Sequence, residues 1–395
     1  MRSVWKYIIL ISVVLLAGCR DRSFRGDWDD YDDNPDNKNL YPVWISVGPY
    51  YGLPTKGDDS QRRDDVPWPE KTIYIYAFKD DNSVTTTYTT TSAANKRVCL
   101  IDGSKDGDMY GGKRGKRNYN DVLLYWDQGV EDRINYPRGN EPYRFYGYIY
   151  DDAIINGIER RDDRIDIALK ITGGQDVMLA YSDPQVTYDA LGDEFTQEAK
   201  DNILKYSYSE YTAKQNIYPQ LLFRHLLTRF KFKMVAGQME EERTIHVKSI
   251  RILSPSEAKF TVAHKNVENM GLFFNENDED RLELREKDGS PLNPNVYYIN
   301  THTPSEKVDV GEHLMVAPKV DYVAEVTVYE DETHREYTNR IPLKSKEGSF
   351  PAGTEYLVTF TIFGIMDVRV DTELVGWIDG GTFEYDPEIK PNNIY

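Results

Sequence analysis

Short stretches in which side chains of two kinds alternate with a period of two constrain the fold of this chain more than any other feature. The clearest stretch is residues 72–78 (TIYIYAF), where Ile73, Ile75 and Ala77 alternate with aromatic side chains. Successive side chains of a β-strand point to opposite faces of the sheet. The segment is therefore predicted to be a strand with an aliphatic face and an aromatic face.

Similar signals recur along the whole chain, separated by turn dipeptides such as Asp102-Gly103 and Gly173-Gly174. The 30 tyrosines against 14 phenylalanines fit this pattern, because tyrosine suits half-buried sheet faces. Many short strands with few helices predict an all-β fold of antiparallel sandwiches. The further strands expected are 41–51, 84–91, 96–101, 121–126, 143–150, 164–171, 176–181, 221–235 (as one long, bent strand), 244–253, 259–263, 281–284, 295–300, 313–317, 322–329, 336–343, 354–363 and 366–377.

The pattern changes between residues 183 and 219. Residues 195–206 (FTQEAKDNILKY) place apolar side chains at helical spacing, and Thr196 or Asp193 could cap the helix. We predict a short helix in a long connection, which is also the candidate domain boundary. A mature chain of about 375 residues is long enough for two cores. The domains expected are residues 41–213 and residues 214–395.

The first 18 residues have the order of a secretory signal. Arg2 and Lys6 precede an uncharged apolar run over residues 7–17, and Cys19 follows the small residues Ala17 and Gly18. The run is too short for a stable membrane-spanning helix. A cysteine at this position predicts a lipoprotein in which Cys19 is acylated, and several acyl chains together anchor a protein stably. The alternative is an ordinary signal peptide with a coincidental cysteine.

Residues 19–40 are polar, with six aspartates between Asp27 and Asp36, and are expected to form an acidic flexible tether. The formal net charge of −18 disfavours nucleic acid as a partner, because phosphate binding needs a basic surface. Once Cys19 is acylated, only Cys99 remains, so no intramolecular disulfide is expected. Cys99 lies in an apolar stretch and is expected to be a buried small side chain.

The sequence contains none of the patterns that would predict an enzyme. The six histidines form no HExxH pair, and GxSxG, P-loop and GxGxxG patterns are absent. Residues 102–108 begin like a calcium loop, but Lys113 occupies the twelfth position, where a bidentate glutamate is required. The acidic residues 275–280 are expected at a hairpin tip. We therefore expect no catalytic residue, no metal site and no cofactor.

Several segments together resemble one known family, in the family's order and over nearly the whole mature chain. The lipobox LAGC at 16–19 precedes the acidic tether. The remaining segments are KTIYIYAF at 71–78, PYRFYGYIYDDA at 142–153, ITGGQDVMLAYS at 171–182, LLFRHLLTRFKFKMV at 221–235, SIRILSPSEAKFTVA at 249–263, HLMVAPKVDYVAEVTV at 313–328 and PAGTEYLVTFTIFGIMDVRVDTELVGWIDGG at 351–381. They resemble the fimbrillin-like proteins of Bacteroidales envelopes, the type V pilins with their tip and accessory subunits.

The resemblance implies two transthyretin-like β-sandwich domains in series, on a lipid-anchored outer-membrane protein exposed at the surface or in a fimbrium. It also implies other fimbrial subunits as partners, with a strand of one subunit completing a neighbour's sheet. In shaft subunits of the family an arginine-specific protease cuts after the first strand. Arg62 and Arg63 lie between the first strand and the strand at 72–78, a position that suits such a cut, whereas the basic loop expected at 113–117 does not. A surface arginine pair that is merely solvated is the alternative.

The tail after Trp377 makes a poor donor strand, because Pro387 and Pro391 cannot donate to a sheet ladder. A tip, accessory or anchor subunit is therefore as plausible as a shaft subunit. The competing hypothesis is a surface lipoprotein that never polymerises and binds a glycan or a host protein.

Overall fold

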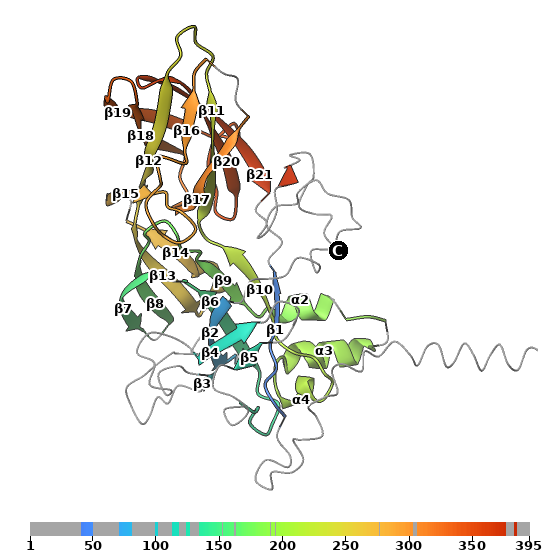
Figure 1. The fold of residues 1–395 in the computed structure, drawn as a ribbon. Helices are drawn as coiled ribbons and strands as arrows, with labels where there is room; N and C mark the ends of the chain where they lie inside the picture. Colours follow the sequence, from blue (N-terminus) through green and yellow to red (C-terminus); the bar gives the residue numbers. More distant parts are fainter. Residues whose placement is uncertain are drawn as a thin grey trace, which may run out of the picture.

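The computed structural model describes residues 41–49, 71–80, 99–101, 113–117, 124–126, 383–384 and 134–376, the last apart from 152, 162, 190, 194, 276 and 303–305. The described chain is mostly β-strand and forms two stacked β-sandwiches, each made of two sheets (Figure 1). The predicted all-β fold of successive antiparallel sandwiches is confirmed. None of the helices in this part of the chain is both long enough and apolar enough to cross a bilayer.

The lower sandwich in Figure 1 pairs an eight-stranded sheet with a four-stranded sheet. The larger sheet has the order β1 (Ser46–Pro49), β10 (Gln220–His225), β9 (Met178–Tyr181), β6 (Tyr143–Ile149), β2 (Lys71–Lys79), β4 (Lys113–Arg117) and β5 (Tyr125–Trp126), with β3 (Cys99–Ile101) beside β2. The smaller sheet has the order β14 (Gly271–Phe274), β13 (Glu257–His264), β8 (Arg164–Lys170) and β7 (Ile154–Arg160), and a 3-10 turn, η6 (Val267–Asn269), precedes β14.

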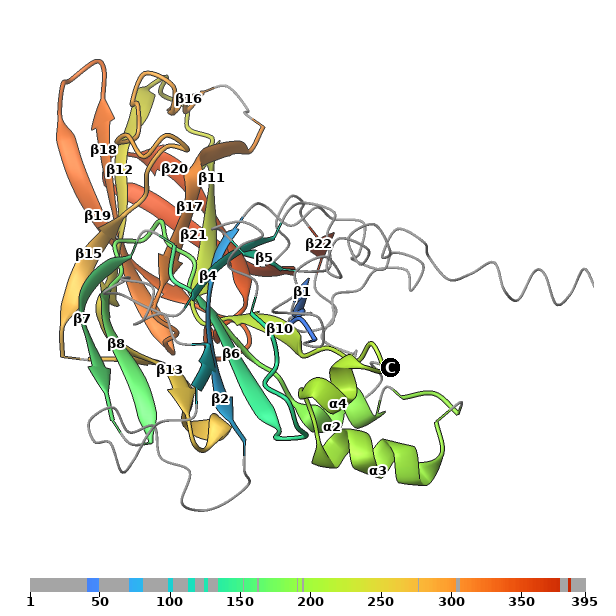
Figure 2. The same ribbon diagram turned by 90° about the horizontal axis from the view of Figure 1, so that it is seen from below.

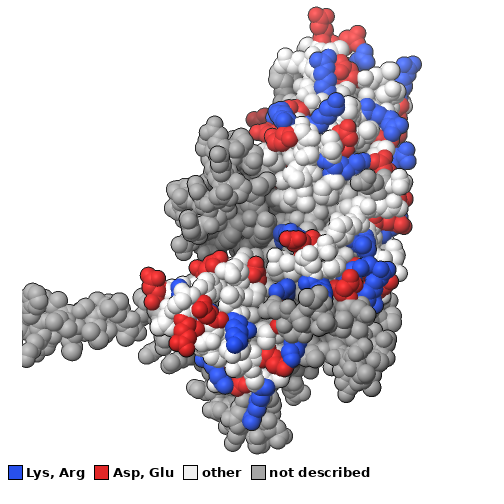
Figure 3. Space-filling view, turned by 180° about the vertical axis from the view of Figure 1, so that it is seen from behind, with Lys and Arg blue, Asp and Glu red and all other residues white. Residues whose placement is uncertain are grey.

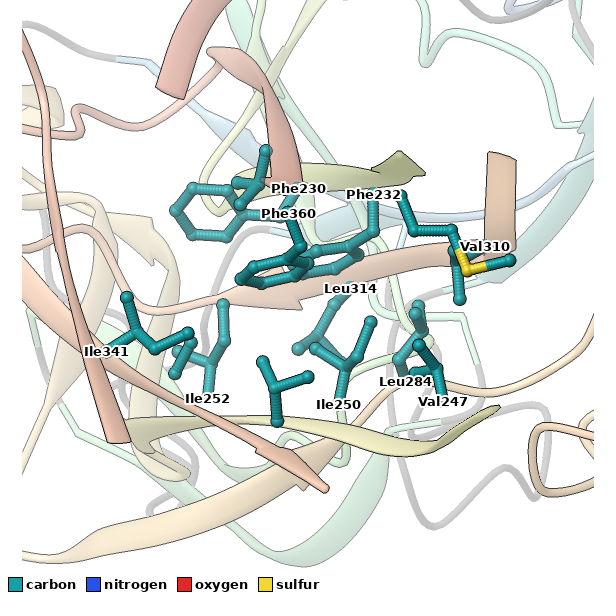
Figure 4. Packing of buried hydrophobic residues seen from close by; sticks show 14 of the residues in the cluster. Phe230, Phe232, Val247, Ile250, Ile252, Leu284, Val310, Leu314, Ile341 and Phe360 are labelled. Atoms are coloured by element: carbon teal, nitrogen blue, oxygen red, sulfur yellow. The ribbon is translucent and has the colours of Figure 1, made fainter. Parts of the chain in front are cut away.

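The upper sandwich consists of two five-stranded sheets. One has the order β17 (Val308–Val316), β11 (Thr228–Ala236), β20 (Glu355–Gly364), β21 (Asp367–Gly376) and β22 (Phe383–Glu384). The other has the order β15 (Glu279–Glu283), β12 (Thr244–Pro255), β18 (Asp321–Glu330) and β19 (Glu336–Lys344), with β16 (Tyr298–Asn300) beside β12. The phenylalanines of β11 and β20 meet the aliphatic residues of β12 between the two sheets (Figure 4).

Strand β2 confirms the alternation that predicted it. Ile73, Ile75 and Ala77 are buried on one face of the large sheet, whereas Tyr76 and Phe78 are buried on the other, against the smaller sheet. The aromatic face continues across the strands, and the ring of Tyr76 stacks on that of Tyr148 with centroids 5.9 Å apart. The many tyrosines thus form much of the core between the sheets.

Three short helices lie together beside the lower sandwich, near β10 (Figure 2). They are α2 (Pro184–Asp189), α3 (Gln197–Lys205) and α4 (Glu210–Ala213). The predicted helix is confirmed as α3, and the Thr196 hydroxyl caps it by accepting the N–H of Ala199 at 3.2 Å. Helices α2 and α4 were not expected from the sequence.

The stretch 221–235, expected as one bent strand, is two strands that belong to different sheets. β10 ends at His225 and β11 begins at Thr228. Leu226 and Leu227 lie between the two strands, and their backbone groups form hydrogen bonds with residues of neither strand. Leu226 N–H donates to Val177 O at 2.8 Å, and Leu227 O accepts from Gly353 N–H at 2.9 Å. The chain leaves the lower sandwich and enters the upper one at this point.

Two segments expected as loops have other roles. Residues 113–117 form strand β4, which pairs with β2, so the expectation of a basic loop there is wrong. Residues 275–280 are not a hairpin tip, because β14 before them pairs with β13, whereas their last two residues begin β15, which pairs with β12. This acidic stretch links the two sandwiches.

The division of the chain at residue 213 stays a prediction, and the strand pairings show how the chain is shared between the sandwiches. Strands β10, β13 and β14 follow that residue in the sequence and pair within the lower sandwich. The chain therefore builds β11 and β12 of the upper sandwich, returns to the lower one for β13 and β14, and crosses back before β15.

Candidate functional site

The first described segment, residues 41–49, lies across the large sheet on the face that looks away from the smaller sheet. Its side chains at every second position are almost completely buried: Val43 is 2 % exposed, Ile45 1 % and Val47 0 %. They belong to the cluster that covers the aliphatic face of β2. The alternation predicted for this segment is thus used to fill a core.

The last part of the segment is strand β1, which pairs in parallel with β10 at the edge of the large sheet. In this register Val47 lies opposite Leu221. Leu221 and Phe223 of β10 are both fully buried and lie over Gly147 of β6, where an added Cβ would be 2.7 Å from Phe223 and 2.8 Å from Leu221. Gly147 therefore makes room for β10, and β10 in turn provides the edge on which β1 lies.

Backbone hydrogen bonds join the segment to other parts of the chain that are distant in sequence. It bonds to the residues before β5, to those before β6 and to the start of β10. The four bonds are Val43 N to Ile134 O (2.7 Å), Tyr136 N to Tyr41 O (2.8 Å), Leu124 N to Ile45 O (3.0 Å) and Ser46 N to Pro219 O (2.9 Å).

Tyrosine hydroxyls line the far side of this core and remain neutral. Burial raises the pKa of Tyr208 to about 12, and its hydroxyl donates to Asp183 O at 3.0 Å and lies 2.7 Å from the Thr187 hydroxyl. Burial also raises the pKa of Tyr136 well above its usual value. The surface that receives residues 41–47 is therefore largely apolar, with neutral tyrosine hydroxyls at some positions, and it suits aliphatic side chains.

The buried side chains stabilise the position of the segment on the large sheet. Burying a Val or Ile side chain is worth about 1.5–3 kcal/mol, so the three side chains contribute roughly 5–9 kcal/mol as an upper estimate. The segment thus combines buried side chains at every second position with a last part, β1, whose backbone pairs at the edge of the large sheet.

The structure places only part of the sequence-predicted sites. Cys19, Arg62, Arg63 and residues 102–108 lie outside the described residues, so their predicted roles stay predictions. Cys99 lies in β3, with its backbone opposite Phe78 of β2. No group of three or more His, Cys, Asp or Glu side chains in the described ranges could hold a metal ion. In the tail, β22 pairs with β21 of its own chain, with Phe383 opposite Gly376.

A second arginine pair has the same neighbours as the first. The tetrapeptide RRDD occurs at 62–65 and again at 160–163. The second copy lies at the hairpin between β7 and β8, where Arg161 N–H donates to Arg164 O at 2.9 Å. The guanidinium of Arg160 donates to the Tyr76 hydroxyl at 3.1 Å. The second copy is thus held within a hairpin of the lower sandwich, whereas the first copy lies outside the described residues.

The partners of the first segment could not be found from the sequence. Leu124 and residues 134–136 carry no local pattern that marks them as its neighbours. Gly147 of strand β6 is the sequence feature that could have indicated close packing here, because a glycine within a strand often marks a place where another part of the chain approaches closely.

No protein-family model matches the chain, and no curated protein matches it by sequence. Solved structures with a similar fold include a proposed cell adhesion protein from Bacteroides uniformis, with 12% identity, 86% of this chain and 99% of that chain covered, and a TM-score of 0.44. A second, from Bacteroides ovatus, has 14% identity, 87% and 100% coverage, and a TM-score of 0.46. The fimbrial anchor protein Mfa2 from Porphyromonas gingivalis has 10% identity, 88% and 100% coverage, and a TM-score of 0.33. All three TM-scores lie below 0.5.

Proposed function

We propose that this protein is a subunit of a cell-surface fimbria that joins its neighbours by strand exchange and contributes to adhesion. The observation that carries the proposal is the burial of Val43, Ile45 and Val47 in the first described segment, which ends in strand β1 and precedes the other described strands in the sequence. A strand at the very start of a fold can be removed or replaced without disturbing the order of the other strands.

The site has both properties that strand exchange needs. Strand β10 would present the backbone groups that now pair with β1, and the core behind it would present apolar space for every second side chain. Since the bound strand contributes several kcal/mol, we expect an incoming strand to displace it rather than to fill a groove that has emptied by itself.

The other parts of the proposed assembly pathway rest on sequence features. Acylated Cys19 would anchor the chain in the outer membrane, with residues 20–40 as a tether. A cut after Arg63 would leave residues 41–49 attached to the body by non-covalent contacts alone. The lipid would then serve for delivery in a processed subunit, and as a lasting anchor in an unprocessed one.

The tail favours an accessory role at the tip or the anchor over a place in the shaft. Its prolines, Pro387 and Pro391, cannot donate to a ladder, and β22 pairs with β21 of the same chain. We therefore propose a subunit that accepts a strand more readily than it supplies one.

Two measurements on native envelopes test this proposal. One is the N-terminal sequence of the protein, and the other is a search for ladders of SDS-resistant polymers on a gel. A start at Asp64 with ladders indicates groove opening and polymerisation, and a start at acylated Cys19 within isolated fimbriae indicates an anchor or uncut subunit. Arg62→Ala/Arg63→Ala should convert the first result into the second, and Arg161→Ala serves as the matched control. Deleting the gene and finding fimbriae of normal number, length and adhesion would refute a fimbrial role.

A further inference from the structure

A polar cleft of about 1010 Å³ lies at the junction of the two sandwiches. The loop of residues 172–175, which follows β8, lines it from the lower sandwich, together with Tyr74 of β2. Strand β15, the turn of residues 285–289 and His313 of β17 line it from the upper sandwich. Its volume matches the upper end of the range for small-ligand sites, roughly 300–1,000 Å³.

The walls of the cleft are held in place by bonds within the protein. The side-chain carbonyl of Gln175 accepts the N–H groups of Thr172 at 2.8 Å and Gly173 at 3.2 Å. Gly173 O in turn accepts from Met315 N–H of β17 at 2.7 Å, which ties the loop to the upper sandwich. A cleft whose walls are already ordered loses little entropy when it binds a ligand.

The charges around the cleft are of both signs, and several of them form ion pairs within the lining or with residues beside it. Among the described lining residues are five carboxylates, three cationic side chains and one histidine. Glu283 lies 2.9 Å from Arg251 and 3.2 Å from Arg285. Acidic and basic side chains are likewise interspersed on the face shown in Figure 3. Such a lining offers many hydrogen-bonding groups without a net attraction for an anion, and its polarity does not suit a lipid.

One aromatic ring adds a flat surface to this polar lining. Tyr74 is half-buried, and its ring stacks on Tyr148 with centroids 5.4 Å apart and on Tyr150 at 4.8 Å. A tyrosine held in this way presents an apolar ring with a polar tip. A sugar ring has the complementary character, with an apolar C–H face and a rim of hydroxyl groups.

We propose that this cleft binds an uncharged oligosaccharide, with the paired polar side chains as hydrogen-bonding partners for its hydroxyls and Tyr74 as the surface against which a ring lies. This site is separate from the first-strand site. The inference therefore goes beyond the proposed function, and it can be tested on the purified full-length chain without any assembly.

Gly174 provides a variant that blocks the cleft without disturbing the fold. It lines the cleft, it lacks the positive φ of Gly173, and a Cβ added to it would meet nothing within 4 Å. Gly174→Trp should therefore place an indole in the ligand space, whereas Gly174→Ala leaves most of that space open. Gly364 at the end of β20 has the same open surroundings away from the cleft, so Gly364→Trp is the matched control.

The test is a glycan array of neutral, sialylated and sulfated oligosaccharides probed with the full-length chain in detergent, followed by calorimetric titration of the neutral glycan that binds best. We expect Gly174→Trp to weaken binding at least about tenfold, Gly174→Ala to weaken it much less than Gly174→Trp, and Gly364→Trp, outside the cleft, to bind like the wild type.

Four outcomes would overturn the proposal: no neutral glycan bound by the wild type, equal binding by Gly174→Trp, binding restricted to sialylated or sulfated glycans, or binding of unstructured peptides alone in a parallel peptide array. The three glycan results do not bear on strand exchange, which the envelope ladders report, and peptide binding alone would count against the glycan site while agreeing with strand addition. Failure of one proposal therefore remains distinguishable from failure of the other.

Discussion

The guanidinium of Arg229 on β11 is bonded to the carboxylate of Glu355, its direct neighbour on the parallel strand β20, and both side chains are buried. Lys231 also approaches this carboxylate, with its Nζ 3.3 Å from Oε1. Burial raises the pKa of Glu355, and the two cations offset part of that shift. The ion pair lies where the chain enters the upper sandwich.

Arg229→Met should lower the free energy of unfolding by about 3–5 kcal/mol, because it leaves a buried carboxylate without its main partner. The double variant Arg229→Met/Glu355→Leu should recover most of that loss, since no buried charge remains. Chemical denaturation of the variants checks this. Arg369→Met, which removes an exposed pair with Asp367, is the control and should cost at most about 1 kcal/mol. Equal losses in the single and double variants would contradict the prediction.

The same carboxylate should make stability depend on pH. Because the pKa of Glu355 is higher in the folded protein than its usual 4.5, the folded state binds more protons above pH 4.5 than the unfolded state does. Its contribution to stability is therefore complete below about pH 4.5 and is lost as the pH rises through the folded pKa. Glu355→Gln should remove this component from a plot of unfolding free energy against pH. An unchanged slope between pH 4.5 and 7 would show that Glu355 does not titrate in this way.

Val47→Asp should loosen the first strand, because it places a charge in a fully buried apolar site. The amide of Ser46, which bonds to Pro219 O, should then exchange with deuterium much faster, while amides of β12 remain protected. Hydrogen exchange followed by mass spectrometry measures this. Val320→Asp, at a site that is 69 % exposed, is the matched substitution and should leave the exchange pattern as it was.

An arginine-specific protease should cut the folded chain within the first RRDD sequence and spare the second. Arg160 and Arg161 are held at the β7–β8 hairpin, and an extended segment cannot enter a protease without breaking the ladder between these strands. Mass spectrometry of a limited digest gives the sites, and the denatured chain, in which both copies should be cut, is the control. Cutting at Arg161 before Arg63 in the folded protein would be evidence against selective processing.

Gly147→Ala should lower the free energy of unfolding by about 1–3 kcal/mol, because the new methyl group would press against Phe223 and Leu221. Thermal and chemical unfolding report the loss. Gly174→Ala makes the same chemical change in open space, so it should be close to neutral. If the two variants unfold alike, the packing of β10 over β6 is not as close as described.

Many strands could be predicted from local patterns, because a strand that packs on one or two cores needs apolar side chains at every second position. The β2 segment shows this most clearly, since its two kinds of side chain enter two different clusters. Helix α3 was predictable for a similar reason, having both apolar spacing and a threonine cap. In these segments the information needed lies within about ten residues.

Pairing between strands that are distant in sequence cannot be predicted from such local patterns. The break at Leu226 and Leu227 depends on Val177 and Gly353, which lie far away in the sequence. Strand β4 is rich in lysine and arginine and resembles a loop, yet it pairs with β2, because strand preference depends strongly on neighbours. The cleft could not be predicted for the same reason, since its walls come from five separated parts of the chain.

The parallel pairing of β1 with β10 also has a mechanical meaning. If a lipid at Cys19 holds the protein, tension between membrane and body reaches the described part of the chain at residue 41 and acts along the segment that ends in β1. A ladder pulled along its own strands is loaded in shear, so its hydrogen bonds and the buried side chains of the segment bear the force together instead of parting one by one. The element best placed for exchange between subunits would then also be the one that carries the load of the anchored fibre.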